Sequence, residues 1–273
     1  MKTQPVLVII LGILSISILL FSATVWQNRI KDAGGVVEDV PPTYEEQGVP
    51  SIENETDKKQ IVSPLGAEDI RKIGSSLDKT TLDVLLTRAE AGESVQMLLI
   101  GSDALSNVGK RLTLAMDKAY SGLVTVDVAT FDTTSSGFVE QQLDSDASID
   151  WQKGYDIVLY EPFTLHNNGI VIIEKEHKDL LEVKAYAESI VNDASFLVTP
   201  PQPIYQAKFY LTQVKALEKF TTARGIPYIA HWQNWPDTQS ADIQNYLDDD
   251  SIPTERGIEM WSDALIAYFT GEQ

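Results

Sequence analysis

The stretch VQMLLIGSDALS, residues 95–106, decides the fold. Its first six residues are mostly large and apolar, a composition that suits a short strand buried on both faces of a sheet. Polar residues follow directly after Gly101, and a helical pattern then covers residues 107–119. The order strand, polar loop, helix is the repeating unit of a parallel α/β sheet.

The same unit recurs along the rest of the chain. Further apolar runs of strand length lie at Leu123–Ala129, Ile157–Tyr160, Phe196–Thr199 and Tyr228–Ala230, and helical patterns cover residues 172–192 and 207–223. Two more amphipathic helices are predicted, each with its apolar residues on one face. The first contains Leu82, Leu85, Leu86 and Ala89, and the second contains Ile258, Trp261, Leu265, Tyr268 and Phe269. The alternation predicts an α/β domain over residues 64–273 with a five-stranded, parallel, doubly wound sheet.

The N-terminus carries an uncharged apolar run at residues 6–26. As a helix this run spans about 31 Å, enough to cross a membrane, and Trp26 stands where an interfacial aromatic belongs. A cleavable signal peptide is the alternative, because Ser22 and Thr24 give a small-x-small pattern, but the run is longer than the usual core of such a peptide. We expect a cytoplasmic segment at 1–5, an uncleaved single-pass anchor in the cell membrane, and an extracytoplasmic C-terminal domain.

Residues 27–63 have the composition of a tether. They are rich in Asp, Glu and Pro, contain the pair Gly34-Gly35, and offer few large apolar side chains. Such a segment cannot bury enough apolar surface to offset the entropy lost on ordering. The composition predicts an acidic, disordered linker between anchor and domain.

Charge and cysteine content exclude several classes of protein. The net charge of −19 argues against a nucleic-acid partner, because no basic patch could easily dominate such a field. The chain has no cysteine, so disulfides, thiolate metal sites, a cysteine nucleophile and a lipidated cysteine are all excluded.

Ligands of doubly wound sheets bind at the carboxyl ends of the strands. At each such end this sequence has a loop rich in polar, glycine, proline or aromatic residues. The loops are GSDALS at 101–106, FDTTSSG at 131–137, EPFTLHNNG at 161–169, PPQP at 200–203 and HWQNWPD at 231–237. We expect the functional site among these five loops.

In this order the loops resemble the SGNH/GDSL hydrolase superfamily over about residues 94–270. The segments at 155–169, 200–205 and 231–236, with PTERG at 253–257, resemble a Gram-positive, membrane-anchored branch of it. The resemblance implies a three-layer α/β/α sandwich of flavodoxin-like topology. It also implies a serine nucleophile after the first strand, oxyanion donors after the second and third, and an Asp-x-x-His before the last helix.

Two of the implied catalytic positions depart from the family pattern. Ser102 takes the place of the family's Asp, and Asp103 takes the place of the nucleophile. Asp249 stands at the acid position, but Ile252 stands at the general base and cannot accept a proton. Serine has no useful nucleophilicity without a positioned base, so the nearby hydroxyl of Ser102 would need another one.

Other residues could complete such a site. The resemblance suggests Gly137 with Asn167 or Asn168 as oxyanion and substrate-binding donors. Aromatic side chains near the loops, Trp232 among them, could stack on sugar rings, or they could belong to the core.

The three histidines are His166, His177 and His231. His166 and His231 follow predicted strands and are candidate general bases; the alternative for each is a packing or hydrogen-bonding role. His177 lies within a predicted helix and is interpreted as a surface residue. Nothing in the spacing of the histidines and aspartates favours a metal, and we expect neither metal nor cofactor.

Two functions fit these observations. The first is an ester hydrolase that removes O-acyl groups from a cell-envelope polysaccharide, with Ser102 as nucleophile and His231 or His166 as base. The second is a catalytically inactive SGNH-like domain that binds a glycan or a protein partner at the cell surface. Both rest on the family resemblance, since fold alone does not define activity.

Overall fold

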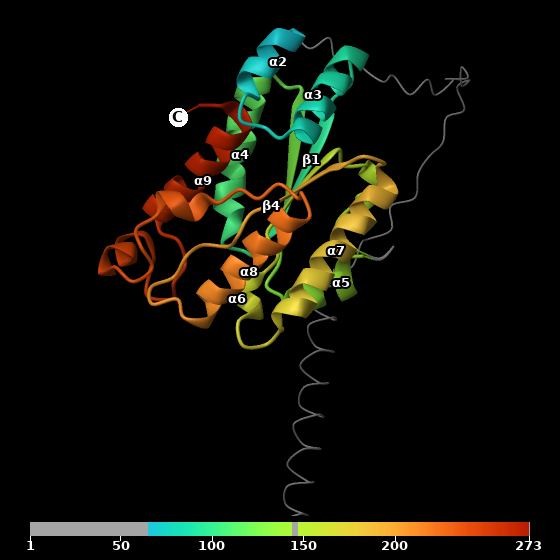
Figure 1. Ribbon diagram of the computed structural model, residues 1–273. Coiled ribbons are helices and arrows are strands. Elements are labelled where there is room, and N and C mark those ends of the chain that lie inside the picture. The colour runs from blue at the N-terminus through green and yellow to red at the C-terminus, as the bar shows by residue number, and fades with distance from the viewer. Residues whose placement is uncertain (1–64, 144–146, 273) are drawn as a thin grey trace, which may run out of the picture. The chain divides into compact units, whose positions relative to one another are not determined.

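The computed structural model describes residues 65–143 and 147–272 (Figure 1). The predicted anchor at 6–26 and linker at 27–63 lie outside these residues. Within the described part of the chain, no helix is long and apolar enough to cross a membrane.

One parallel sheet forms the centre of the domain. Its strands are β1 (Val95–Gly101), β2 (Val124–Thr130), β3 (Ile157–Tyr160) and β4 (Ser195–Val198), in the order β2-β1-β3-β4. The chain therefore adds strands first to one side of β1 and then to the other. The point of reversal lies between β1 and β3, which is where doubly wound sheets bind their ligands.

Helices cover both faces of the sheet, which confirms the predicted α/β class (Figure 1). Alternate residues of β1 enter different cores, since Met97 and Leu99 pack into one cluster and Leu98 and Ile100 into the other. The first cluster lies under α2 (Ala67–Ile73), α3 (Lys79–Ala91), α4 (Leu105–Tyr120) and α9 (Glu255–Thr270). The second lies under α5 (Ser135–Gln142), α7 (Ile173–Ile190) and α8 (Phe209–Ala223).

The prediction of five strands was wrong. The run Tyr228–Ala230 makes only an isolated parallel bridge between Tyr228 and Val198, so the sheet has four strands. The segment is short because Pro227 has no N–H to donate and the chain turns into the 3₁₀ helix η2 (His231–Asn234). It still lies beside β4, since Ile229 donates its N–H to the carbonyl of Val198 at 2.8 Å.

Short elements complete the carboxyl side of the sheet. The helix α6 (Thr164–Asn167) follows β3, and the 3₁₀ helix η3 (Ala241–Tyr246) precedes α9. A further 3₁₀ turn, η1 (Trp151–Lys153), comes before β3, at the amino end of that strand. The polar loops quoted from the sequence thus follow β1 to β4 and the Tyr228–Ala230 segment. Parallel strands bring these loops to one edge of the sheet, here called the carboxyl edge.

Candidate functional site

Glu161 is the central side chain of the carboxyl edge. It follows β3, is fully buried, and accepts the N–H of Ser102 on Oε2 at 2.7 Å and the N–H of Phe163 on Oε1 at 2.8 Å. Burial raises the pKa of Glu161, and hydrogen bonds from Ser102 and Phe163 together with nearby His166 oppose that rise. One carboxylate therefore joins the ends of β1 and β3 at the point where the sheet reverses.

The Glu161 carboxylate also fixes the start of α6. Phe163 has a φ of 59°, a left-handed conformation that is uncommon for a residue with a side chain. Its ring is fully buried between Phe138 and Tyr160, and its N–H is bound to Glu161. Packing and the buried hydrogen bond together hold the strained residue, and α6 begins directly after it.

His166 lies on α6, near Glu161. Its Nε2 stands 3.3 Å from Oδ1 of Asp132, a residue of the loop after β2 whose side chain is 83% exposed. Its Nδ1 is buried and has no hydrogen-bond partner among the described residues. Of the two predicted bases, His166 is the one with a ring nitrogen free for another group.

Asn167, a predicted oxyanion donor, is buried and fully bonded inside the protein. Its Oδ1 accepts the N–H of Ser135 at 2.9 Å, and its Nδ2 lies 2.8 Å from Oε2 of Glu176 and 3.1 Å from the Ser135 hydroxyl. The side chain ties α5, α6 and α7 together. Asn168, in contrast, is exposed at the end of α6.

Glu176 and Asp179 extend this buried network along α7. Glu176 accepts the Thr164 hydroxyl at 2.8 Å, and burial raises its pKa to about 7. Asp179 accepts the hydroxyls of Ser135 and Ser136, each at 2.8 Å, and pairs with Lys175. The network positions α5 and α6 against α7, below the loops of the carboxyl edge.

Glu176→Gln is expected to flatten the dependence of stability on pH. A buried carboxyl with a raised pKa costs no stability below its unfolded pKa near 4.5; the cost grows as pH rises from there to about 7 and is constant above. At about 1.4 kcal/mol per pH unit, the ionised group costs about 3 kcal/mol at pH 8. Glutamine can still accept from Asn167 and donate to Thr164. Urea unfolding of the unaltered protein and of Glu176→Gln at pH 5 and pH 8 measures how far the free energy of unfolding of each depends on pH.

The matched control is Glu174→Gln, on the exposed face of the same helix. We expect this variant to follow the unaltered protein at both pH values. Parallel pH dependences for the unaltered protein and Glu176→Gln would contradict the raised pKa.

Gly137, the other predicted oxyanion donor, lies in the first turn of α5. Its N–H donates to the Thr134 hydroxyl at 3.2 Å, which is the N-cap bond of that helix. A Cβ at this position would stand 2.4 Å from Oγ1 of Thr133, so the glycine also allows a close approach. The N–H of Gly137 is therefore bound to the N-cap residue of α5.

His231 is buried with both ring nitrogens bonded. Nε2 lies 2.9 Å from the carbonyl of Pro200, and Nδ1 accepts from Nε1 of Trp235 at 3.1 Å. The ring stacks on Trp261 with centroids 4.7 Å apart and planes 7° from parallel. Burial lowers the pKa of His231 to about 3, so the ring joins η2, α9 and the loop after β4 as a neutral side chain.

Trp232 is half-buried beside His231. Its Nε1 donates to the carbonyl of Pro201 at 2.7 Å, and its ring lies 5.5 Å from that of Tyr210 on α8. The tryptophan thus packs on a small apolar cluster with Ala207, Tyr210 and Val214, and only part of its ring is left for a ligand.

The segment that the loop resemblance assigns to the family's acid and base positions forms a closed turn. Oδ1 of Asp248 accepts the N–H groups of Asp250 and Ile252 at 3.0 and 2.8 Å, and Asp248 donates its N–H to the carbonyl of Ile252 at 2.9 Å. Asp249 is exposed, and the Ile252 side chain is 50% exposed. Gln202, in the loop after β4, reaches the carbonyl of Ser251 at 3.3 Å, so this turn borders the carboxyl edge.

Ser102 and Asp103 differ sharply in exposure. Ser102 is 3% exposed and adjoins Glu161, whereas Asp103 is exposed at the start of α4. The structure thus gathers Ser102 and His166 around Glu161. It places Asn167, Gly137 and His231 in structural hydrogen bonds, and leaves Asp103, Asn168 and Asp249 at the surface.

Sequence reasoning missed the buried acids Glu161 and Glu176. Two signals were available for them. Glu161 directly follows a strand that is buried throughout, and Glu176 lies at the helical spacing of the buried residues Leu180, Val183 and Ala187 on α7. An acid on an apolar face requires a partner, and here both acids have two donors.

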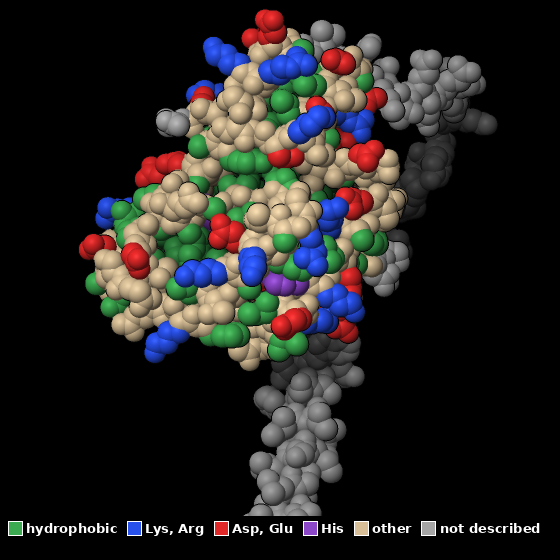
Figure 2. All heavy atoms as spheres, viewed as in Figure 1, with side chains coloured by type: hydrophobic (Ala, Val, Ile, Leu, Met, Phe, Trp, Pro, Cys, Tyr) green, Lys and Arg blue, Asp and Glu red, His purple; other side chains and the backbone are tan. Residues whose placement is uncertain are grey.

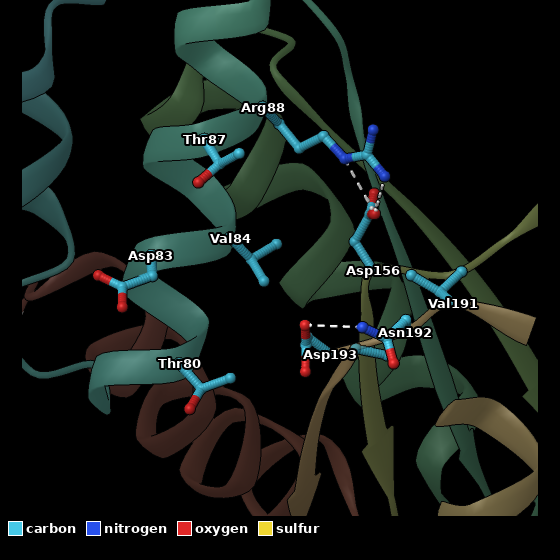
Figure 3. Close-up of a pocket in the computed structure, with 10 residues that line it drawn as sticks. Thr80, Asp83, Val84, Thr87, Arg88, Asp156, Val191, Asn192 and Asp193 are labelled. Atoms are coloured by element: carbon cyan, nitrogen blue, oxygen red, sulfur yellow. Dashed lines mark hydrogen bonds and ion pairs between the residues drawn. The ribbon is translucent and has the colours of Figure 1, made fainter. Parts of the chain in front are cut away.

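A separate cavity of about 480 Å³ lies at the opposite edge of the sheet, between α3 and the turn from α7 to β4 (Figure 3). Arg88 points across it, but Nε and Nη2 of its guanidinium bind Oδ1 of Asp156, and Nη1 binds Glu93 (Figure 3). Oδ2 of Asp156 accepts the N–H of Gln96 at 2.9 Å. These charges are satisfied within the protein, so the described residues that line the cavity offer no free cation to a ligand.

Comparison with known proteins gives the fold and little else. No family model matches the sequence, and no curated protein matches it. Solved structures do match. An α/β hydrolase enzyme from the metagenome of Lake Arreo has a TM-score of 0.52 at 11% identity, over 64% of this chain and 94% of the other. A candidate GDSL-like lipase from Parabacteroides merdae gives 0.51 at 10% identity, over 65% and 96%.

A carbohydrate esterase of family 3 from Talaromyces cellulolyticus is similar at the same level, with a TM-score of 0.50 and 11% identity over 63% of this chain and 94% of the other. The described domain therefore has the fold of the SGNH/GDSL hydrolases, as the resemblance in the loops implied. At these identities the likeness shows the fold alone.

Proposed function

We propose that this chain is a membrane-tethered, SGNH-like binding protein that holds a cell-envelope polymer at the carboxyl edge and does not hydrolyse it. One observation carries the proposal. Ile252, which the loop resemblance assigns to the family's base position, is half exposed in a turn closed by Asp248. An aliphatic side chain cannot take a proton from a nucleophile, so the machinery for acyl transfer is incomplete.

The remaining groups support the same proposal. The N–H of Gly137, the amide of Asn167 and both nitrogens of His231 are bound within the protein. An oxyanion hole requires donors aimed at the developing charge, not at the protein's own acceptors. The buried carboxyl of Glu161 beside Ser102 would, when ionised, repel an alkoxide or oxyanion formed there.

The location of the ligand follows from the predicted anchor. A span at 6–26 and an acidic linker at 27–63 would keep the domain outside the membrane, where envelope polymers are within reach. The exposed groups at the carboxyl edge, among them Asp103, Asn168 and the free part of Trp232, are suited to hydrogen bonding and stacking with sugars.

One observation favours hydrolysis as the second candidate. His166 has a buried Nδ1 without a partner among the described residues and an Nε2 beside Asp132, on the same edge as Ser102. An Asp–His pair near a serine is the arrangement that activates serine nucleophiles. In that case Ser102 would attack an acyl ester and His166 would accept its proton.

Hydrolysis of p-nitrophenyl acetate by the full-length protein in mild detergent separates the two candidates. We expect the unaltered protein, Ser102→Ala and His166→Ala to give the same rate as buffer with detergent. His231→Ala is the control for a change of structure alone. A rate for the unaltered protein that falls at least about tenfold in both Ser102→Ala and His166→Ala would favour hydrolysis.

A further inference from the structure

α8 carries lysines that have no acidic partners. Lys208 is the N-cap residue of α8, at the carboxyl edge, and Lys215 and Lys219 follow within the helix. All three lysines are exposed. None of them forms an ion pair with a carboxylate within the described residues, although the chain as a whole carries a net charge of −19. We call Lys208, Lys215 and Lys219 the basic row.

The neighbouring helix provides the contrast. On α7, Lys175, Lys178 and Lys184 each pair with a carboxylate one turn further along, at Asp179, Glu182 and Glu188. Figure 2 shows Lys and Arg side chains spread across the face over α7 and α8. The lysines of α8 have no such partner among the described residues, so an outside anion would meet uncompensated positive charge along this helix.

The spacing of the basic row suits an extended ligand. Residues seven and four positions apart lie on the same side of a helix, so the three lysines point the same way. From Lys208 to Lys219 the helix rises about 16 Å, longer than a single small anion. At the far end Arg224 stacks on Phe220, with the guanidinium carbon 3.7 Å from the ring centroid, which extends the positive charge.

We infer that the polymer bound at the carboxyl edge is anionic, with repeated phosphate or carboxylate groups, and that the basic row follows it along α8. This inference rests on the proposed function and names the class of ligand. The basic row begins at Lys208, directly after the loop that follows β4, so it starts at the carboxyl edge and runs from there along α8. Surface charge of one sign raises the local concentration of opposite charge and makes binding dependent on salt.

The test uses full-length protein in a nonionic detergent and fluorescently labelled linear polyphosphate, with binding followed by polarisation. We expect the variant K208Q/K215Q/K219Q to bind at least tenfold more weakly than the unaltered protein. The matched control R71Q/K72Q/K118Q removes the same charge from exposed positions on α2 and α4, and it should bind within about threefold.

Three results would overturn the inference. Equal losses in the two triple variants would mean that only net charge matters. Binding of a neutral glucan but not of polyphosphate would leave the proposed function standing and remove the anionic ligand. Displacement of labelled polyphosphate by phosphatidylglycerol vesicles, but not by unlabelled polyphosphate or poly-glutamate, would assign the row to a lipid surface. Hydrolysis of p-nitrophenyl acetate that depends on Ser102 would instead overturn the proposed function.

Discussion

Replacing Asp103 with serine and Ile252 with histidine together is expected to give the protein esterase activity. The fold is that of the SGNH/GDSL hydrolases, and the loop resemblance assigns these two positions to the family's nucleophile and base. The same resemblance assigns Asp249 to the acid position. Serine and histidine side chains supply the nucleophile and base of a triad, but the donors at Gly137 and Asn167 stay bound within the protein, so we expect p-nitrophenyl acetate hydrolysis only about tenfold above the unaltered protein.

Both substitutions are at exposed positions, so the fold should tolerate them. The single variants are the controls, and each should remain inactive, because a serine without a base and a base without a serine do not form an acyl-enzyme. A folded double variant with no more activity than the singles would contradict the correspondence of positions 103 and 252 with the family site.

Trp261→Ala is expected to lower the free energy of unfolding by about 3–5 kcal/mol. Trp261 is fully buried on α9, and its ring covers the imidazole of His231. Truncation leaves a large cavity and admits water to that ring. The midpoint of urea unfolding measures the loss. The pKa of His231, followed by NMR, should rise from about 3 towards the ordinary value of 6.5, because burial is what lowers it.

Trp232→Ala is the matched control, since Trp232 is half-buried in the same region and does not stack on His231. We expect it to cost about 1–2 kcal/mol and to leave the pKa of His231 low. A loss below about 1 kcal/mol for Trp261→Ala would contradict the assignment of the His231–Trp261 stack to the core of the domain.

Most of the fold could be predicted from the sequence because β1, β3 and β4 are short, apolar and largely buried on both faces. The run Ile157–Tyr160 matches β3 residue for residue, and the pattern over 172–192 matches α7 to within two residues at each end. The prediction of a fifth strand was wrong because an apolar composition alone does not make a segment pair with a neighbouring strand. Pro227 and the turn at His231 leave Tyr228 with a single bridge.

The site was harder to predict because the sequence shows which residues follow a strand but not where their hydrogen bonds go. His166 and His231 look equivalent in the sequence, each following an apolar run. In the structure Trp261 and two hydrogen bonds surround His231, while His166 keeps a free nitrogen. Glu161 was missed because a lone acid in a loop is usually solvated, and its burial depends on the distant Ser102.

These findings change the meaning of the family resemblance. The fold has a carboxyl edge of the kind at which doubly wound sheets bind ligands, and the Glu161 carboxylate joins the ends of β1 and β3 there. The fold alone therefore does not define the chemistry of this chain.

The rate of p-nitrophenyl acetate hydrolysis by the unaltered full-length protein tests the central claim most directly. The double variant Asp103→Ser with Ile252→His serves as the positive control for a folded, accessible site. We predict that the unaltered protein gives the rate of buffer with detergent and that Ser102→Ala leaves this rate unchanged. A rate well above buffer that is lost in Ser102→Ala would contradict the claim that the domain binds its ligand without hydrolysing it.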